Sequence, residues 1–268
     1  VNNLKSRTEK KLALRLCDLK KCENRENLRI YGELLKANLY RLESGARFAE
    51  VDNYYDDMKT VRIPLDPALS PQKNAVKYFK DYKKTYTAEQ MLTRLTEKDR
   101  DELIYFDSVL DSIARSKTAA DIAEIREELA LAGYIKRQEK RKKNAPAPKL
   151  QEYVSAEGYK IIVGKNNSQN DYLTTSLAAK SDLWFHVKNL PGSHVIVFSH
   201  GGEVSDETIL KAARLAALNS KAAASSNTAV DYTPVKYVKK PNGAKPGMVI
   251  YTANKTVYVT PDKGGLTE

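Results

Sequence analysis

A long run of apolar residues at helical spacing, beginning at Ser70, constrains the fold of this chain more than any other feature. Ser70 is a typical helix cap and Pro71 suits the first helical position, so the run has a defined start. The apolar residues that follow, mostly three or four positions apart, are Val76, Phe79, Tyr82, Tyr86, Leu92, Leu95, Leu103, Phe106, Leu110 and Ile113. A helix extending to Arg115 would be roughly 60 Å long, and its apolar stripe requires a partner of similar length.

Residues 3–43 supply that partner. One face of this segment is apolar at steps of three and four, whereas the remaining positions are mostly Lys, Arg, Glu and Asn. The apolar face consists of Leu12, Leu16, Leu19, Leu28, Tyr31, Leu35 and Leu42. The pattern predicts one long helix, and two such helices bury their stripes most simply as an antiparallel hairpin, a coiled coil.

The segment between the two helices, residues 44–69, breaks the helical period and is rich in turn-forming residues. Polar and apolar residues alternate at 60–63, so we expect a small β-containing tip on the hairpin. Such a tip suits contact with a distant surface, although it also serves simply to reverse the chain. A third helix is predicted from a Thr118 cap to Gly133, a typical stop residue.

The pattern changes after a basic segment that contains Ala and Pro. Short strands are predicted at 160–163, 183–188, 194–199, 228–232, 235–239, 248–251 and 256–260, with helices at 172–179 and 206–219. The fold class is therefore α+β, a helical hairpin followed by a compact mixed α/β domain. The expected domains are a coiled-coil region at 1–135, a basic linker at 136–150 and a C-terminal domain at 151–268.

Positive charge is unevenly distributed along the chain. The net charge is +11, of which residues 1–150 carry +8 and residues 151–268 carry +3, and the segment 136–149 has seven bases and one acid. A basic chain of this kind is attracted to polyanions, so RNA or DNA is the expected partner. The alternative is a coiled coil and linker that are basic for solubility alone.

We expect a cytoplasmic protein. No run approaches the ~18 to 20 apolar residues of a membrane span, and no apolar block follows the charged N-terminal residues. Cys17 and Cys22 would lie about 140° apart around a helix, as two ordinary residues in a reducing compartment. The chain begins without Met and within a predicted helix, so we expect it to be part of a longer protein.

The stretch 182–197 concentrates the rarest side chains, since it holds the only tryptophan and two of the three histidines. Alternation places Trp184, His186 and Lys188 on one face of a strand, opposite the apolar residues at 183, 185 and 187. Two histidines without a third ligand rarely bind a metal, and His194 lies beside Ser193 without the turn that exposes a nucleophile. We therefore expect no metal, no cofactor and no enzymatic activity.

An RNA-binding surface fits the same residues better. Single-stranded RNA is held by stacking on aromatic rings and by lysine contacts to phosphate, and the face with Trp184 is predicted to be exposed. The segment 164–171 adds a lysine and several amides, and the loop 238–247 adds three lysines. For each group a structural role remains open: a core tryptophan, amides that cap the next helix, and lysines in a solvated turn.

Several stretches carry a resemblance to a known family. VGKNNSQNDYLT, DLWFHVKNLPGSHVIV and VDYTPVKYVKKPNGAKPGMVIY resemble the three signature blocks of the NFACT-R domain. RIPLDPALSPQKNAVKYFKDYKK and EIREELALAGYIK resemble the coiled-coil middle region of bacterial NFACT proteins. These proteins are the RqcH group, also called fibronectin-binding protein A-like. The resemblance covers essentially the whole chain, in the order of the C-terminal half of the family.

The resemblance implies a role in ribosome-associated quality control. The family binds the free large ribosomal subunit that carries an obstructed peptidyl-tRNA and recruits alanyl-tRNA, and the subunit then adds a C-terminal alanine tail to the nascent chain. The coiled-coil arm is expected to reach the stalk base. The NFACT-N and helix-hairpin-helix segments are expected before Val1, and since tRNA selection is attributed largely to them, this part alone is not expected to support tailing.

The resemblance implies that the RNA-facing positions of this chain are Lys165, Asn166, Asn167, Asn170, Asp171, Trp184, His186, His194, Lys239, Lys240 and Lys245. Lys188 joins the expected set because strand alternation places it on the face of Trp184 and His186. Asn189 stands where the family pattern would as readily have Asp. Two other functions compete with this one, the first suggested by the family's alternative name and the second by the two histidines. One is a surface adhesin that binds fibronectin, and the other is an RNA-processing enzyme that uses His186 and His194.

Overall fold

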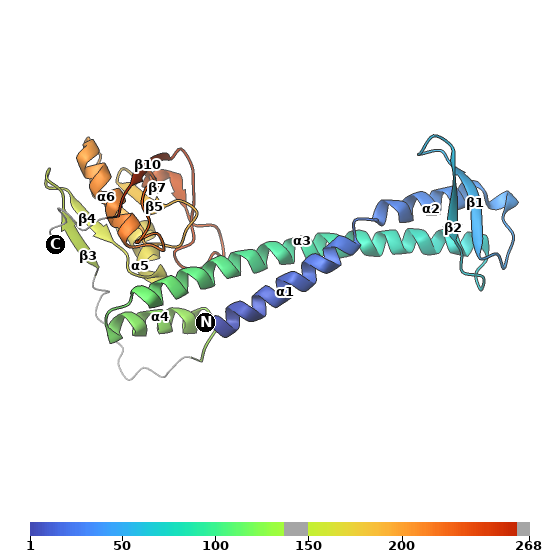
Figure 1. The fold of residues 1–268 in the computed structure, drawn as a ribbon, viewed down its shortest axis with the longest axis horizontal. Coiled ribbons are helices and arrows are strands. Elements are labelled where there is room, and N and C mark those ends of the chain that lie inside the picture. Colours follow the sequence, from blue (N-terminus) through green and yellow to red (C-terminus); the bar gives the residue numbers. More distant parts are fainter. Residues whose placement is uncertain (137–149, 262–268) are drawn as a thin grey trace. The chain divides into compact units, whose positions relative to one another are not determined.

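The structure is a computed structural model that describes residues 1–136 and 150–261, and its ribbon is drawn in Figure 1. The chain divides into two compact units, Ser6–Glu102 and Val1–Lys5 together with Leu103–Glu268. The predicted linker at 136–150 lies outside the described residues except at its two ends. Within the described ranges, no helix is both long and apolar enough to span a membrane.

The first unit is built on an antiparallel packing of helices. Helix α1 (Asn2–Lys21) runs beside the long helix α3 (Pro71–Arg115), whose predicted bounds are confirmed. The Arg15 guanidinium lies 2.5 Å from the Asp99 carboxylate, and the Thr8 hydroxyl donates to Glu102. Thr8 precedes Arg15 in α1, whereas its partner Glu102 follows Asp99 in α3, so the two helices run antiparallel and form the expected hairpin.

The prediction of one helix over residues 3–43 is wrong. The structure has α1 and a separate helix α2 (Arg25–Ala37), with a turn at 22–24 and a short 3₁₀ turn at Leu39–Arg41. The Cys22 side chain is buried at the turn, and the change of direction places Leu34 and Leu35 in the core of the tip. Apolar periodicity did not indicate the break because leucines continue on both sides of it.

The tip is a β-hairpin, which confirms the predicted β-containing segment. Strands β1 (Phe48–Asn53) and β2 (Lys59–Pro64) pair antiparallel, with Phe48 opposite Pro64 and Asn53 opposite Lys59. The inward side chains include Val51 and Ile63, and they pack on α2.

The second unit contains a six-stranded antiparallel sheet in the order β10-β7-β5-β6-β4-β3. Its strands are β3 (Gln151–Val154), β4 (Lys160–Val163), β5 (Leu183–Val187), β6 (Val195–Val197), β7 (Thr228–Pro234) and β10 (Lys255–Val259). A two-stranded ribbon pairs β8 (Val238–Lys239) with β9 (Ile250–Tyr251). The prediction missed β3, which directly follows the linker.

Both faces of this sheet are covered. Helix α6 (Asp206–Leu218) packs on one face of the sheet (Figure 1). The side chains of Phe185 and Val187 are buried there among the alanines of the helix. On the other face Trp184 and Ile196 are buried with Leu173 and with residues of the chain that follows β7. Phe185 and Trp184 are neighbours on β5, so this strand is apolar on both sides, as in a fully buried strand.

Three more elements complete the second unit. Helix α4 (Ala119–Leu131) begins with the predicted Thr118 cap, whose side chain accepts from the Asp121 backbone in a capping box. Helix α5 (Asn167–Tyr172) continues into a π-helical turn at Leu173–Leu177, so it starts earlier than the predicted 172–179. The predicted α+β class, a long helical region followed by a mixed sheet domain, is confirmed.

Candidate nucleic-acid interface

Trp184 does not lie on an exposed face, which corrects the prediction from strand alternation. Its side chain has no exposed surface, and its ring packs against His186, His194 and Tyr251 with centroid distances of 4.8 to 5.6 Å. The indole N–H has no hydrogen-bond partner among the described residues. A base could reach this ring only if the covering segments moved away.

The two histidines form part of the same buried cluster. His194 is fully enclosed and its Nδ1 lies 2.7 Å from the Thr174 hydroxyl, whereas His186 keeps a partly exposed edge. Burial lowers the pKa of His186 to about 4, and it also holds the pKa of His194 well below the usual value. Both rings are therefore neutral near pH 7 and do not offer positive charge to phosphate.

The Asn-rich segment 164–171 attaches the sheet domain to α4. Asn166 caps α5 by accepting from the Gln169 backbone, and its amide donates to the Glu124 carboxylate at 2.8 Å. Gln169 donates to the same carboxylate at 2.7 Å, and the amide of Asn167 donates to the Ser108 hydroxyl at 2.9 Å. The amides expected to face RNA are thus buried and bonded within the protein.

Glu128 of α4 is the carboxylate at the centre of this contact. It accepts from the Tyr105 hydroxyl at 2.8 Å, the Asn167 amide at 3.2 Å, and the backbone and hydroxyl of Ser168. Burial raises the pKa of Glu128, and the donors that surround it favour the ionised form. The arrangement is a polar joint between α3, α4 and α5.

Asn170 and Asp171 tie α5 to two neighbouring loops. The Asn170 carbonyl oxygen accepts from the His194 backbone at 3.0 Å, and its amide donates to the Gly192 carbonyl at 3.2 Å. A Cβ at Gly164 would lie 2.2 Å from that carbonyl oxygen, so the chain requires glycine there. Asp171 accepts from the Lys240 ammonium at 2.8 Å and from the Gly247 backbone at 3.3 Å.

The five predicted lysines differ in their surroundings. Lys165 and Lys188 are half-exposed, and each ammonium lies 3.9 Å from a carboxylate, of Asp121 and Asp231 respectively. The Lys245 ammonium lies 4.7 Å from the centre of the Tyr134 ring, a cation–π contact within the protein. Lys240 is paired with Asp171, as described above.

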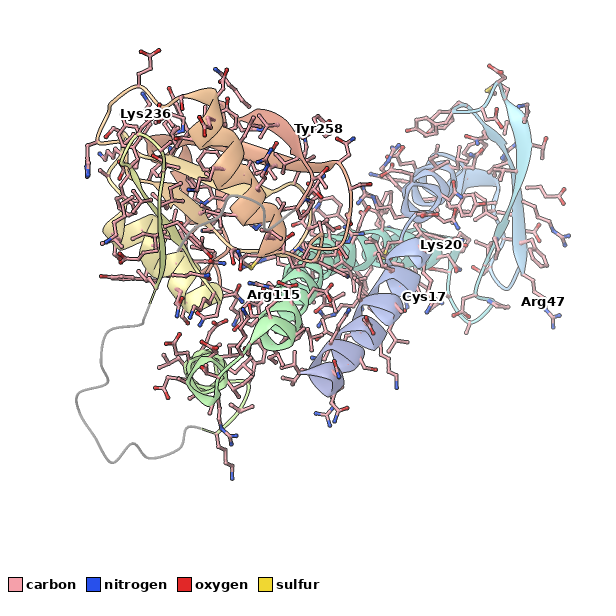
Figure 2. The ribbon with its side chains drawn as sticks, turned by 60° about the vertical axis from the view of Figure 1, so that its left-hand side comes forward. Cys17, Lys20, Arg47, Arg115, Lys236 and Tyr258 are labelled. Atoms are coloured by element: carbon pink, nitrogen blue, oxygen red, sulfur yellow. The ribbon has the colours of Figure 1, made fainter. Side chains whose placement is uncertain are left out.

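The predicted Lys239 lies in an exposed group whose other members the prediction missed. This group, here called the Lys–Tyr cluster, consists of Lys180, Lys236, Tyr237 and Lys239. The Lys236 backbone donates to the Lys180 carbonyl at 3.0 Å, and the Lys236 ammonium lies 5.0 Å from the centre of the Tyr237 ring. Figure 2 labels Lys236 at the surface of this unit. The signal in the sequence was the alternation of Tyr with Lys in VKYVKK.

Within residues 1–136 and 150–261, no three His, Cys, Asp or Glu side chains are grouped so that they could hold a metal ion. The exposed Lys–Tyr cluster instead combines ammonium groups with an aromatic ring 39% exposed. These are the groups that contact phosphates and unstacked bases.

Comparison with known proteins accounts for nearly the whole chain. Residues 1–147 match the NFACT N-terminal and middle domains, and residues 149–253 match the NFACT protein RNA binding domain. The protein named Rqc2 homolog RqcH from Bacillus subtilis is 47% identical over 244 residues, which are 90% of this chain and 42% of that protein. The relative of the same name from Streptococcus suis is 42% identical over 95% of this chain and 46% of its own length.

A solved structure is also similar over most of this chain. It is the C-terminal part of the fibronectin/fibrinogen-binding protein from Streptococcus suis, 35% identical, with a TM-score of 0.67 and coverage of 98% of this chain and 94% of that one. The chain spans about half the length of the curated RqcH relatives that it matches. Because the N-terminal and middle-domain match alone covers more than half of the residues, the chain belongs to the NFACT family.

Proposed function

We propose that this chain is part of a ribosome-associated quality-control factor of the RqcH type. It binds the large ribosomal subunit and tRNA in the cytoplasm, and it supports the addition of C-terminal alanine to stalled nascent chains without being an enzyme itself. The observation that carries the proposal is the match of both halves of the chain to NFACT domains, including the family's RNA binding domain. The net charge of +11 supports a polyanionic partner.

Within the sheet domain, the Lys–Tyr cluster is the surface that best suits contact with tRNA. Lys236 and Lys239 are exposed, and among the described residues neither is paired with a carboxylate. Tyr237 lies between them in the sequence, and its exposed ring can stack with an unpaired base. Lys240 and Lys245 are already held by Asp171 and by aromatic rings, so removing them disturbs the fold as well as the charge.

The first test measures the binding of the chain to tRNA and to isolated large ribosomal subunits over a range of salt concentrations. Binding through phosphate contacts should weaken steeply between ~50 and ~300 mM salt, because each contact releases a counterion. If the chain bound neither RNA at low salt, or bound with an affinity independent of salt, the proposal of direct RNA binding would fail.

The second test asks whether tRNA binds at the Lys–Tyr cluster. The variant Lys236→Gln/Lys239→Gln should bind tRNA roughly tenfold more weakly, since two phosphate contacts are lost. The matched control is Lys221→Gln/Lys255→Gln, which removes the same charge from two exposed lysines that form no ion pair with any described residue. Equal weakening of tRNA binding in both variants would show a response to net charge alone. Unchanged binding in the first variant would show that the Lys–Tyr cluster does not contact tRNA.

The proposed role in alanine tailing requires the full-length protein. Cells that carry Lys236→Gln/Lys239→Gln in that protein should show fewer C-terminal alanine tails on stalled nascent chains, at an unchanged protein level. A full level of tailing, together with reduced tRNA binding, would separate this surface from the tailing reaction.

A second candidate function is the binding of fibronectin, because the structurally similar Streptococcus suis protein is named for fibronectin and fibrinogen binding. Fractionation of cells that produce the full-length protein distinguishes the two functions. A protein found with the ribosomal subunits supports the quality-control role, whereas one found at the cell surface, where it binds immobilised fibronectin, supports the adhesin.

A further inference from the structure

The outward face of α3 carries cations without acids. Between Lys73 and Lys98 the helix contains seven bases and three acids. At 100° per residue, all seven bases fall within an arc of about 120° around the helix, and none of the three acids falls within that arc. This cation stripe consists of Lys73, Lys77, Lys80, Lys83, Lys84, Arg94 and Lys98, and all of these side chains are exposed.

Most of the stripe has no partner within the protein. Lys77 lies 3.1 Å from the Asp66 carboxylate, and the other six cations form no ion pair with any described residue. The three acids of the segment lie to either side of the stripe, and Glu89 is engaged by Arg25 of α2. A solvated helix face ordinarily mixes the two signs, so an acid-free stripe indicates an anionic partner.

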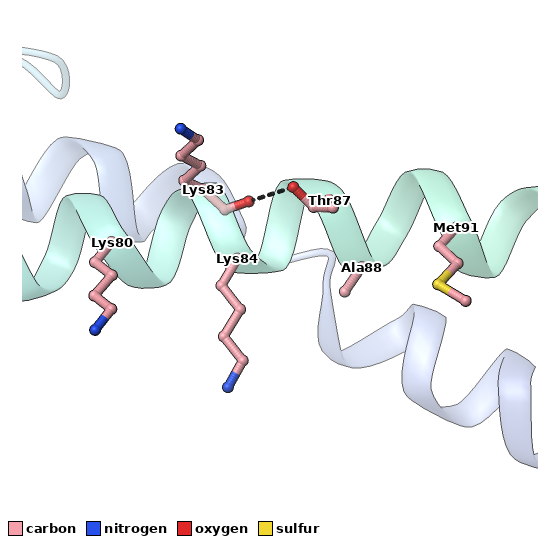
Figure 3. Close-up of a pocket in the computed structure, with 6 residues that line it drawn as sticks. All are labelled: Lys80, Lys83, Lys84, Thr87, Ala88 and Met91. Atoms are coloured by element: carbon pink, nitrogen blue, oxygen red, sulfur yellow. Dashed lines mark hydrogen bonds between the residues drawn. The ribbon is translucent and has the colours of Figure 1, made fainter.

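The middle of the stripe is drawn in Figure 3. The ammonium groups of Lys80, Lys83 and Lys84 extend away from the helix, with Lys80 and Lys84 on the same side. Together with Thr87, Ala88 and Met91 these lysines line a shallow depression on α3. The Thr87 hydroxyl donates to the Lys83 carbonyl at 3.0 Å and so remains part of the helix surface.

We infer that the cation stripe of α3 binds the phosphate backbone of a double-helical RNA. The stripe is a straight line of charge about 37 Å long, from 25 residue steps of 1.5 Å. The tyrosines of this part of α3, Tyr78, Tyr82 and Tyr86, lie on the opposite half of the helix from the stripe. Without aromatic rings the stripe cannot stack unpaired bases as single-strand binders do, whereas charge alone suffices to contact the regular backbone of a duplex. The inference goes beyond the proposed function and takes from it only that the partner is RNA.

The experiment compares three variants of the chain. Lys80→Gln/Lys83→Gln/Lys84→Gln removes the centre of the stripe, and glutamine retains helix propensity. Lys10→Gln/Lys11→Gln/Lys20→Gln removes equal charge from exposed positions of α1. Lys80→Arg/Lys83→Arg/Lys84→Arg keeps the charge of the stripe. Circular dichroism and thermal melting establish that each variant is folded.

Each variant is titrated with a short blunt RNA duplex, with oligouridine and with large ribosomal subunits. The stripe variant should bind the duplex at least about tenfold more weakly, with a salt dependence reduced by about 2 to 3 in log–log slope. The α1 variant and the arginine variant should stay within about threefold of the unmodified chain. The large-subunit affinity should fall in the stripe variant only.

Three results would overturn the inference. The first is an equal loss of duplex affinity in the stripe and α1 variants, because the duplex would then respond to net charge alone. The second is a duplex affinity that the stripe variant retains. The third is a loss of subunit binding without loss of duplex binding, which would assign the stripe to an acidic protein. If the chain bound the duplex through the stripe but bound neither tRNA nor subunits, the proposed function would fail while the stripe assignment stood.

Discussion

Glu128 shows how a single buried charge can organise a contact between secondary-structure elements. Its carboxylate is 3% exposed and accepts hydrogen bonds from Tyr105, Asn167 and Ser168. A buried charge is tolerated where its lone pairs are satisfied, and removing it leaves the donors without partners. The Asn-rich segment is therefore explained by the needs of this carboxylate and of Glu124.

Replacing Glu128 with alanine should lower the free energy of unfolding of the second unit by roughly 2 to 4 kcal/mol, because three side chains lose a shared acceptor. Urea denaturation followed by circular dichroism measures the change. Arg126→Ala, on the exposed side of the same helix, should change stability by less than about 0.5 kcal/mol. A similar loss in both variants would contradict the role of the polar joint.

The buried histidines should make the second unit sensitive to acid. The folded pKa of His186 is about 4, below the usual histidine value of about 6.5, and that of His194 is also lowered. For His186 the unfolded chain therefore binds more protons between pH 6.5 and pH 4, so the stability that this residue contributes should fall as the pH drops through that range. His194 acts in the same direction because its pKa is also lowered. For His186 alone the full loss is on the order of 3 to 4 kcal/mol.

The measurement is the difference in pH-dependent stability between the unmodified chain and His186→Gln, which should show a shallower loss. Glu128 and Asp111 have raised pKa values and act in the opposite sense, so the comparison must be between variants rather than absolute. His200→Gln removes an exposed histidine and is the matched control. An identical pH profile in the two variants would rule out the histidine as the source.

At the scale of elements, sequence patterns predicted helix ends well where capping chemistry was present. Ser70 and Pro71 mark the start of α3, and Thr118 marks the start of α4. The break between α1 and α2 has no Gly or Pro, and its signal is tertiary, because it depends on the burial of Leu34 and Leu35 in the tip. Local periodicity cannot report a change of packing partner.

The capping box of α4 gives a test at this scale. Thr118→Ala removes the acceptor for the Asp121 backbone and should lower stability by about 1 kcal/mol. Thr87→Ala is a control with the same chemical change in the interior of α3, where alanine is the better helix former. Thermal melting should show a decrease for the first variant and no decrease for the second.

The prediction that Trp184 is exposed failed because other elements of the domain cover its face of β5. Alternation along β5 correctly separates the residues of its two faces, but it cannot say whether the second face meets water. The turn after α5 and the chain after β7 cover that face, and neither cover is visible in the strand's own sequence. The candidate site was therefore predictable as a set of neighbours but not as a set of exposed groups.

At the scale of the whole molecule, the compact units do not divide at the linker. The second unit includes the end of α3 and all of α4, because Ser108, Glu124 and Glu128 bind the Asn-rich segment. Arg115 also donates to the Ser193 hydroxyl at 3.2 Å. The basic linker is a feature of composition, whereas the boundary between the units depends on contacts.

Two fragments test this boundary. A fragment of residues 103–268 should be more stable than one of residues 151–268, by roughly 2 kcal/mol or more, because the shorter piece exposes the Asn-rich segment without its carboxylate partners. Equilibrium denaturation of both fragments measures the difference. Equal stabilities would show that α4 contributes nothing to the sheet domain.

The burial of Trp184 also gives the molecule an intrinsic fluorescence probe of unfolding. It is the chain's single tryptophan and lies fully enclosed in the sheet domain. Its fluorescence therefore reports the opening of that domain alone, while far-ultraviolet circular dichroism is dominated by the long helices. Both signals can be recorded on one sample without attaching a label. Their comparison shows whether the long helices and the sheet domain unfold together or in separate steps.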